Sequence, residues 1–285
     1  MSSRMPFLFP LLLAAACSKT NAWDSPEGKD WIQVEASPAD ATCGLRMDGT
    51  AECWGPDADD GLAPPSDYLV DMALSHLFYG INYDAEIVVG EERGDGVHAL
   101  DLSDLLDGTR YIDAAAGSAW ICGLSEEGAL RCTGSSSVIS AVPQSGHYAQ
   151  ISGGNWYLCA RRADGTASCW DEDSQQIDRL GPYTTLDAGP RGACGVAENG
   201  ELRCWGDVFV EDDSGPYKDV SVGTAIACAL DRQSVIWCWW DPTIVSNVVP
   251  PTDGPFIGLA AGTFQVCGLR LDGGISCAQA EAAGE

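Results

Sequence analysis

The sequence predicts an all-β fold, a seven-bladed β-propeller of antiparallel sheets. Twelve of its thirteen cysteines form six pairs of identical ten-residue spacing, glycines and aromatic residues recur at fixed offsets from them, and the first cysteines from Cys122 onward are 34 to 39 residues apart. A unit of that length is typical of a propeller blade, and no unit carries the 3.6-residue period of a helical solenoid. The pairs are Cys43–Cys53, Cys122–Cys132, Cys159–Cys169, Cys194–Cys204, Cys228–Cys238 and Cys267–Cys277.

Each cysteine pair encloses a predicted β-hairpin. In the first copy, the apolar runs 43–45 and 51–54 flank Met47-Asp48-Gly49, with the glycine where the turn needs a positive φ. The cysteines of the pair then lie opposite one another, at a Cα separation that suits a disulfide. Trp54 points to the other face of the sheet. The glycine recurs in five pairs, and Ser234 replaces it in the sixth.

A further strand precedes each hairpin, as in residues 111–116 and 217–222, and a segment rich in Pro, Ser and Asp follows it. The first gap between cysteine pairs holds two units. Its cysteine-free copy, 68–90, has Phe78 or Tyr79 and Val88 or Val89 in the cysteine positions. The predicted units are near 31–67, 68–110, 111–147, 148–182, 183–216, 217–255 and 256–285. A six-bladed ring with an insertion is the alternative.

The string Cys-Gly-Leu, two residues, Asp-Gly, three residues, Cys-Trp-Gly in 43–55 resembles the regulator of chromosome condensation repeat, and 194–206 nearly matches it. The resemblance covers about 31–278 and implies a seven-bladed propeller. Nuclear members of the family are nucleotide exchange factors that bind chromatin, and bacterial relatives include a secreted β-lactamase inhibitor protein that binds through loops on one face. The family's Asn-x-x-Gly-Gln-Leu-Gly stretch is reduced to 57–62 in the first unit.

Residues 1–16 are predicted to be a signal peptide, because the apolar run 5–16 is too short to span a bilayer. Leu13-Ala-Ala-Ala-Cys17 resembles a bacterial lipobox, which implies cleavage before Cys17 and a lipid on its thiol. Acylation also accounts for the odd thirteenth cysteine. Residues 17–30 then form the lipidated cysteine and a polar tether, and the protein is anchored in the bacterial cell envelope, at the outer membrane or the cell surface. The alternative is a plain secretory signal cut after Ala16 or Ala22, which gives a secreted protein.

Export favours a disulfide in each of the six pairs. Each bridge closes a loop of about ten residues and is worth about 2–3 kcal/mol by the loop-entropy estimate. The alternative is six pairs of buried free thiols. No zinc site or other cofactor is expected, because the chain has no C-x-x-C pair and only three histidines, His76, His98 and His147.

The formal net charge of −27 excludes nucleic-acid binding of the ordinary counterion-release kind. Two interpretations of the acidity remain: solubility with mutual repulsion, or a basic partner or divalent cations. Three acidic clusters are candidates for weak calcium binding, although none spells an EF-hand loop. They are Asp57, Asp59 and Asp60; Asp171, Glu172 and Asp173; and Glu211, Asp212 and Asp213.

No catalytic motif marks the chain as an enzyme: it has no nucleophile elbow, no P-loop and no histidines at ligand spacing. The sequence therefore predicts a monomeric, lipid-anchored scaffold for protein–protein interaction without catalysis. An inhibitor of an extracellular enzyme and a carbohydrate-binding or hydrolytic propeller are the alternatives, since a chance carboxylate pair would suit glycoside hydrolysis.

Large residues lie between the recurrent glycine and the first cysteine of several units, in loops that a propeller gathers on one face. Trp, Tyr and Arg are typical interface anchors. The predicted partner-binding residues are Trp120, Asn155, Trp156, Tyr157, Arg191, Phe264 and Gln265. The alternative is that these side chains pack between neighbouring blades.

Overall fold

The computed structural model describes residues 27–37, 41–56, 58, 63–74, 78–90, 100–143, 145–211 and 215–283. The predicted signal peptide, the lipidation site Cys17 and the tether as far as residue 26 lie outside these residues. The first acidic cluster, Asp57 with Asp59 and Asp60, and two members of the third, Asp212 and Asp213, also lie outside them.

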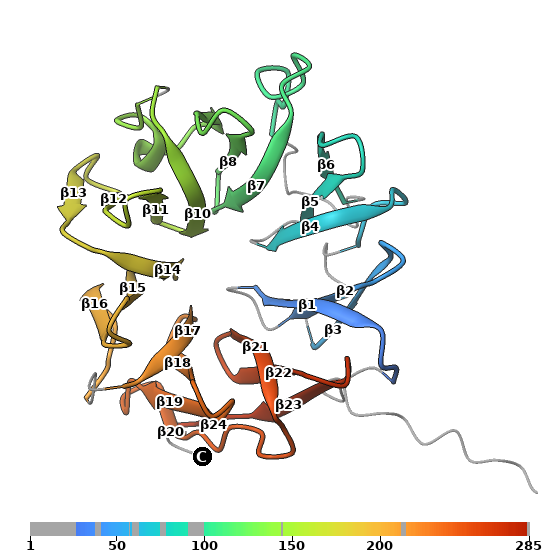
Figure 1. Cartoon of the computed structure of the whole chain (residues 1–285), viewed down its shortest axis with the longest axis vertical. Helices are drawn as coiled ribbons and strands as arrows, with labels where there is room; N and C mark the ends of the chain where they lie inside the picture. Colours follow the sequence, from blue (N-terminus) through green and yellow to red (C-terminus); the bar gives the residue numbers. More distant parts are fainter. Residues whose placement is uncertain are drawn as a thin grey trace, which may run out of the picture.

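Among the described residues, seven antiparallel sheets of three or four strands are arranged around a central axis (Figure 1), which confirms the predicted all-β propeller. Blades 1 to 4 are built of β1 (Trp31–Ala36), β2 (Thr42–Arg46) and β3 (Ala51–Trp54); β4 (Leu69–Leu74), β5 (Phe78–Asn82) and β6 (Ile87–Val89); β7 (Tyr111–Ala116), β8 (Trp120–Ser125) and β9 (Leu130–Gly134); and β10 (Tyr148–Gly154), β11 (Tyr157–Arg162), β12 (Ala167–Asp171) and β13 (Gln176–Arg179). Blades 5 to 7 are built of β14 (Tyr183–Ala188), β15 (Gly192–Ala197) and β16 (Leu202–Gly206); β17 (Tyr217–Val222), β18 (Ile226–Asp231) and β19 (Ile236–Trp240); and β21 (Phe256–Ala261), β22 (Gln265–Arg270) and β23 (Ile275–Gln279).

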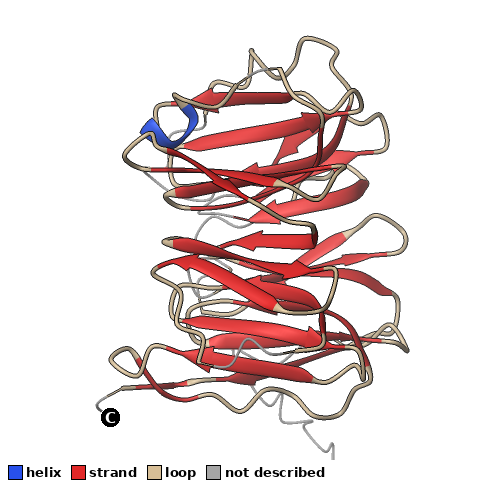
Figure 2. Cartoon of the chain, turned by 60° about the vertical axis from the view of Figure 1, so that its left-hand side comes forward, coloured by secondary structure: helices blue, strands red, loops and turns tan. Residues whose placement is uncertain are grey.

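The strands of every blade are consecutive in the chain, and the cysteine-free copy forms a blade of its own from β4 to β6. Seven blades therefore replace the alternative of six with an insertion. Figure 2 shows the blades stacked side by side with one short helical turn, η1 (Ser137–Ile139). No helix in the described ranges combines the length and the apolar character that crossing a bilayer requires.

The hairpin register follows the predicted pairing, and all six cysteine pairs form disulfides with Cα–Cα distances of 4.0–4.1 Å. Cys43 lies opposite Cys53, and in blade 2 the same positions hold Tyr79 and Val89. The turn keeps its left-handed residue even without glycine, since Ser234 has φ +67° and Ala85 of blade 2 has φ +63°. Blade 2 therefore shows that turn and strand pairing set the register without a sulfur bridge.

The core consists of layers between neighbouring blades, and each blade contributes two different faces. The disulfide face of blade 4, with Cys159 and Cys169, packs against Tyr183 and Trp205 of blade 5. The same arrangement places Cys267 of blade 7 against the aromatic face of blade 1. Aromatic pairs recur inside these layers, with ring centroids 6.1 Å apart in Trp31–Trp54, 6.2 Å in Tyr148–Trp170, 5.8 Å in Tyr183–Trp205 and 5.7 Å in Tyr217–Trp239. The recurrent tryptophan thus lies on the sheet face opposite the disulfide, as the alternation of a strand predicts.

The ring closes by packing of blade 1 on blade 7. Trp31 and Trp54 share a buried layer with Leu269 and Ile275, and the backbone N–H of Trp31 donates to the carbonyl of Gly273 at 3.1 Å. In the part of the chain that the structure describes, no blade combines strands from both chain ends. The last strand, β24 (Glu281–Ala282), pairs instead with β20 (Val245–Asn247), which follows blade 6.

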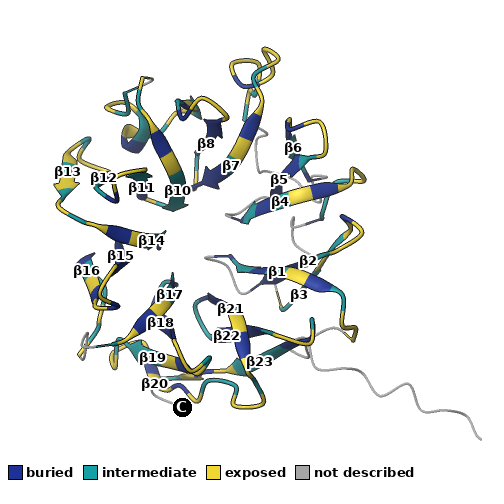
Figure 3. Ribbon diagram, in the orientation of Figure 1, coloured by how far each residue is buried: buried dark blue, intermediate teal, exposed yellow. Residues whose placement is uncertain are grey.

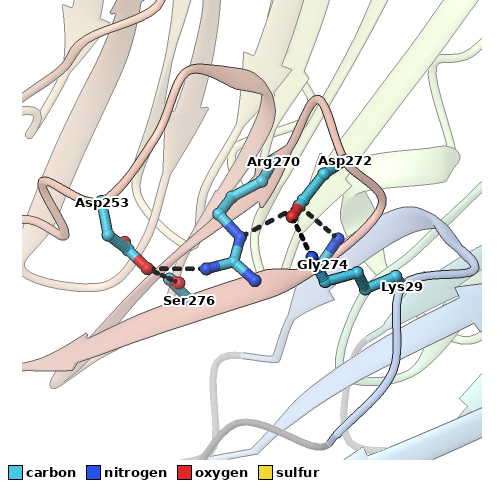
Figure 4. A network of polar contacts seen from close by, with 6 residues as sticks. All are labelled: Lys29, Asp253, Arg270, Asp272, Gly274 and Ser276. Atoms are coloured by element: carbon cyan, nitrogen blue, oxygen red, sulfur yellow. Dashed lines mark hydrogen bonds and ion pairs between the residues drawn. The ribbon is translucent and has the colours of Figure 1, made fainter.

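Polar contacts support this junction at the surface (Figure 4). Lys29, which precedes β1, pairs with Asp272 of blade 7 at 2.8 Å, and Arg270 bridges Asp272 and Asp253. The Lys29 side chain is 69% exposed, so water screens its ion pair and the pair contributes little to stability. The buried layer, rather than this network, therefore holds the ring closed.

Candidate functional site

The two faces of the propeller are formed by different kinds of connection between strands. The first strand of each blade begins beside the hairpin and ends beside the turn that leads to the second strand, as in Trp31 opposite Arg46 and Ala36 opposite Thr42. We call the end with these inter-strand turns the turn face and the other end the hairpin face. Strands of five or six residues separate the two by about 15–20 Å. The predicted partner-binding residues all belong to the turns, or to the strand ends beside them.

Three of these residues are buried and a fourth, Phe264, is partly buried, which corrects that part of the prediction. Trp120 is completely buried between blades 3 and 4, and its Nε1 donates to the carbonyl of Asn155 at 3.3 Å. Tyr157 and Gln265 are also buried, and Phe264 packs against the layer between blades 6 and 7. These side chains pack between blades because neighbouring sheets must fill the space where the turns begin.

Sequence position distinguishes the buried residues from the exposed ones. Trp120, Tyr157 and Gln265 each stand two residues before the first cysteine, where the side chain points into a layer between blades. Trp156, Arg191 and Phe264 stand one residue earlier, in the turn itself; Trp156 and Arg191 are exposed, whereas Phe264 is partly buried. Aligning the turns on the cysteine would have identified the three fully buried positions, but not the packing of Phe264.

Trp156 and Arg191 line a hollow of about 440 Å³ on the turn face. A second hollow of about 340 Å³ adjoins it and shares Arg191 and Asp207. We call the two together the turn-face groove, which crosses blades 4, 5 and 6. Its lining includes Trp156, Tyr157, Asp171, Glu172, Asp173, Pro190, Arg191, Asp207, Val208, Phe209, Thr224, Asp241 and Ile244.

Backbone hydrogen bonds place the acidic residues of this groove beside the turns. Asp207 and Asp241 follow the third strands of blades 5 and 6, and their N–H groups donate to the carbonyls of Arg191 and Ala225 at 3.0 and 2.9 Å. Blades 5 and 6 thus each fasten the segment after their third strand to their own inter-strand turn. The carboxylates are presented at the rim as a result.

The turn-face groove is acidic, with five carboxylates and one guanidinium. Hydrogen bonds from the Thr243 side chain and backbone lower the pKa of Asp241, and the charge of Arg191 adds to this effect. The groove also exposes aromatic surface, since Trp156 is 41% and Phe209 45% exposed. Acidic and aromatic groups are therefore available together at one concave surface.

A second acidic region lies on the axis, where the first strands converge (Figure 3). A cavity of about 200 Å³ there is lined by first-strand residues, including Glu35, Asp71, Asp113 and Asp187. No lysine, arginine or histidine of the described residues lines it. Burial raises the pKa of Asp71 to about 6 and that of Asp113 to about 8, and it raises the pKa values of Glu35 and Asp187 as well.

The axial carboxylates join neighbouring blades. Asp187 of blade 5 accepts hydrogen bonds from Ser152 Oγ of blade 4 and from the N–H of Val222 of blade 6, both at 2.6 Å. Asp113 of blade 3 accepts one from the N–H of Ile151 in blade 4 at 2.9 Å. Sequence reasoning missed these groups, although acidic residues at the third or fifth position of the first strand would have marked them.

The described residues contain no group of three or more His, Cys, Asp or Glu side chains placed to hold a metal ion. Of the three predicted calcium clusters, only Asp171 to Asp173 lies wholly within them. Asp171 Oδ1 accepts the backbone N–H groups of Asp173 and Gln175, each at 3.1 Å, so this carboxylate stabilises its own turn.

No protein-family model matches the sequence. Among solved structures, the chain is similar to the ectodomain of receptor kinase CR4 from Physcomitrella patens, with 22% identity, a TM-score of 0.70 and coverage of 88% of this chain and 73% of that one. It is similar to the CRINKLY WD40 ectodomain of receptor kinase ACR4 from Arabidopsis thaliana, with 19% identity, a TM-score of 0.71 and coverage of 87% and 95%.

The chain is also similar to Prp20p, the RCC1 protein of Saccharomyces cerevisiae, with 12% identity, a TM-score of 0.66 and coverage of 90% and 83%. That structure is described together with the binding of Prp20p to Gsp1p and histones. At these identities the likeness shows the fold alone. It confirms the propeller that the repeat resemblance implies, and membership of that family stays a prediction.

Proposed function

We propose that the protein is a non-catalytic scaffold that binds another protein through its turn-face groove. The observation that carries this proposal is the joint exposure of Trp156, Arg191 and Phe209 along one concave surface. Tryptophan and arginine are the residues most enriched among energetic anchors of interfaces. A surface that crosses three blades also has room for an extended contact.

The scaffold acts outside the cytoplasm, attached by a lipid on Cys17. Six disulfides are typical of proteins that fold in an oxidising compartment, and this supports the export predicted from residues 1–16. The anchor is checked by feeding cells an alkyne-labelled fatty acid. We expect the label on the full chain and its loss in Cys17→Ser; an unlabelled wild-type protein would contradict the anchor.

Site-specific photo-cross-linking tests the scaffold. A photoreactive amino acid is placed at position 156 of the full chain, and in a matched variant at Met47, which is 70% exposed on the hairpin face. We expect irradiation of intact cells to give one discrete protein adduct from position 156 and none from position 47. Equal adducts from both positions, or none from position 156, would exclude the groove as the binding surface.

A further inference from the structure

We propose that the occupant of the turn-face groove is an extended segment of the partner protein rich in arginine or lysine. The proposal rests on the proposed scaffold function and names the chemistry that the groove recognises. Its first support is charge complementarity. Asp171, Glu172 and Asp173 lie at the blade 4 end, Asp207 in the middle, and Asp241 at the blade 6 end. Carboxylates are thus spaced along the whole groove.

The second support is the apolar surface between these carboxylates. Val208, Phe209 and Ile244 line the hollow at blades 5 and 6, where Phe209 is 45% and Ile244 36% exposed, whereas Ala225 and Ile226, which also line it, are buried. Arginine and lysine have long apolar stems with a charged tip, so they bury the stem on such a surface and hold the tip at an acidic rim. Shorter or purely polar side chains would satisfy only one of these two features.

Trp156 supplies the third support. Its indole is 41% exposed in the same hollow as Asp171, Glu172 and Asp173. A cation placed over a tryptophan ring is attracted by the electrons of the ring face, and arginine uses this contact most often. A guanidinium placed there would meet the ring and the carboxylates at the same time.

Arg191 allows a basic occupant of the groove to be distinguished from an acidic one. Among the described residues that line the groove, Arg191 is the single positive charge, and it is exposed. A cationic segment is repelled by it, whereas an acidic segment would need it. Removing this charge should therefore strengthen the binding of a basic occupant and weaken that of an acidic one.

The overall charge of −27 attracts any cation, so the experiment must distinguish binding in the groove from general attraction by the charge of the whole protein. The probe is a fluorescein-labelled octapeptide that alternates arginine with serine, and its counterpart carries uncharged citrulline in place of arginine. Binding to the oxidised full chain is followed by fluorescence anisotropy in 100 mM salt. The groove variant is Asp173→Asn with Asp207→Asn. The matched control is Glu127→Gln with Glu198→Gln, which removes two exposed charges from the hairpin face.

We expect the arginine peptide to bind and the citrulline peptide to bind at least about 10-fold more weakly. The groove variant should weaken the arginine peptide by about 5- to 10-fold, and the hairpin-face control by less than about 2-fold. Trp156→Ala should weaken it by about 3- to 10-fold. Arg191→Gln should strengthen it by about 2-fold.

Equal weakening by the two double variants would overturn the proposal, because the charge of the whole protein would then explain binding. Failure of the arginine peptide to bind, or weaker binding in Arg191→Gln, would overturn it as well. So would calcium alone displacing the peptide at micromolar concentration. A protein adduct at position 156 without peptide binding would reject the basic occupant and leave the scaffold standing, whereas peptide binding without any adduct would reject the scaffold.

Discussion

The axial carboxylates and the carboxylates at the hairpin tips are chemically identical, but the pKa values of the two groups shift in opposite directions. Asp113, on the axis, accepts a backbone hydrogen bond, yet burial and the neighbouring Asp71 raise its pKa to about 8. Asp164, at a hairpin tip, accepts two hydrogen bonds from Thr166, which lower its pKa. The comparison teaches that hydrogen bonds favour the ionised carboxyl in both regions, and that on the axis desolvation and the neighbouring Asp71 outweigh them.

The two regions therefore respond to pH with opposite sign. The pKa of Asp113 is raised on folding, so its contribution to stability is complete below the unfolded value near 4 and is lost as pH rises through about 8. The pKa of Asp164 is lowered on folding, so its contribution is present above that unfolded value and is lost as pH falls through the folded one.

The largest effect is expected at Asp187, the axial carboxylate that joins three blades. Asp187→Ala leaves Ser152 Oγ and the N–H of Val222 without their acceptor in a buried site. The loss should lower the free energy of unfolding by about 2–3 kcal/mol, measured by urea titration at pH 6.

Asp187→Asn is the control for this effect, because it keeps one acceptor oxygen and should cost less than half as much. A stability of Asp187→Ala equal to that of the wild type would mean that the axial carboxylates do not join the blades.

A smaller effect of opposite sign is expected at Asp113. Asp113→Asn keeps an acceptor for the N–H of Ile151 and removes the charge. At pH 9 it should raise the free energy of unfolding by on the order of 2 kcal/mol. At pH 3, below the unfolded pKa, the variant and the wild type should be nearly equal, since the wild-type carboxyl is then protonated in both the folded and the unfolded state.

A carboxylate at a hairpin tip, Asp164, provides the variant that is compared with Asp113→Asn. Asp164→Asn should lower stability slightly at every pH above the unfolded value near 4, pH 9 included, and the difference from the wild type should disappear as pH falls through the folded pKa. Thermal unfolding of both variants from pH 3 to 9 checks the comparison. A pH profile of Asp113→Asn parallel to that of the wild type would show that Asp113 is ionised normally.

The sequence alone determined the modules of this protein. The ten-residue spacing of Cys43 and Cys53, the turn residue Gly49 and the recurrent aromatic residues sufficed for the hairpin register, the disulfides and the two faces of each blade. These features are local, because a short hairpin leaves its strands one pairing that satisfies both the turn and the alternation of side chains. Even blade 2, with Tyr79 and Val89, obeys the same pairing.

The tertiary structure alone decided what the modules bring together. Three features involve residues from different blades. Trp120 is buried between blades whereas Trp156 is exposed. Asp71, Asp113 and Asp187 converge on the axis, and one groove extends from Asp171 to Asp241. Such contacts depend on the angle at which one sheet packs on the next. That angle follows from the summed volumes of side chains from two blades, which no single repeat contains.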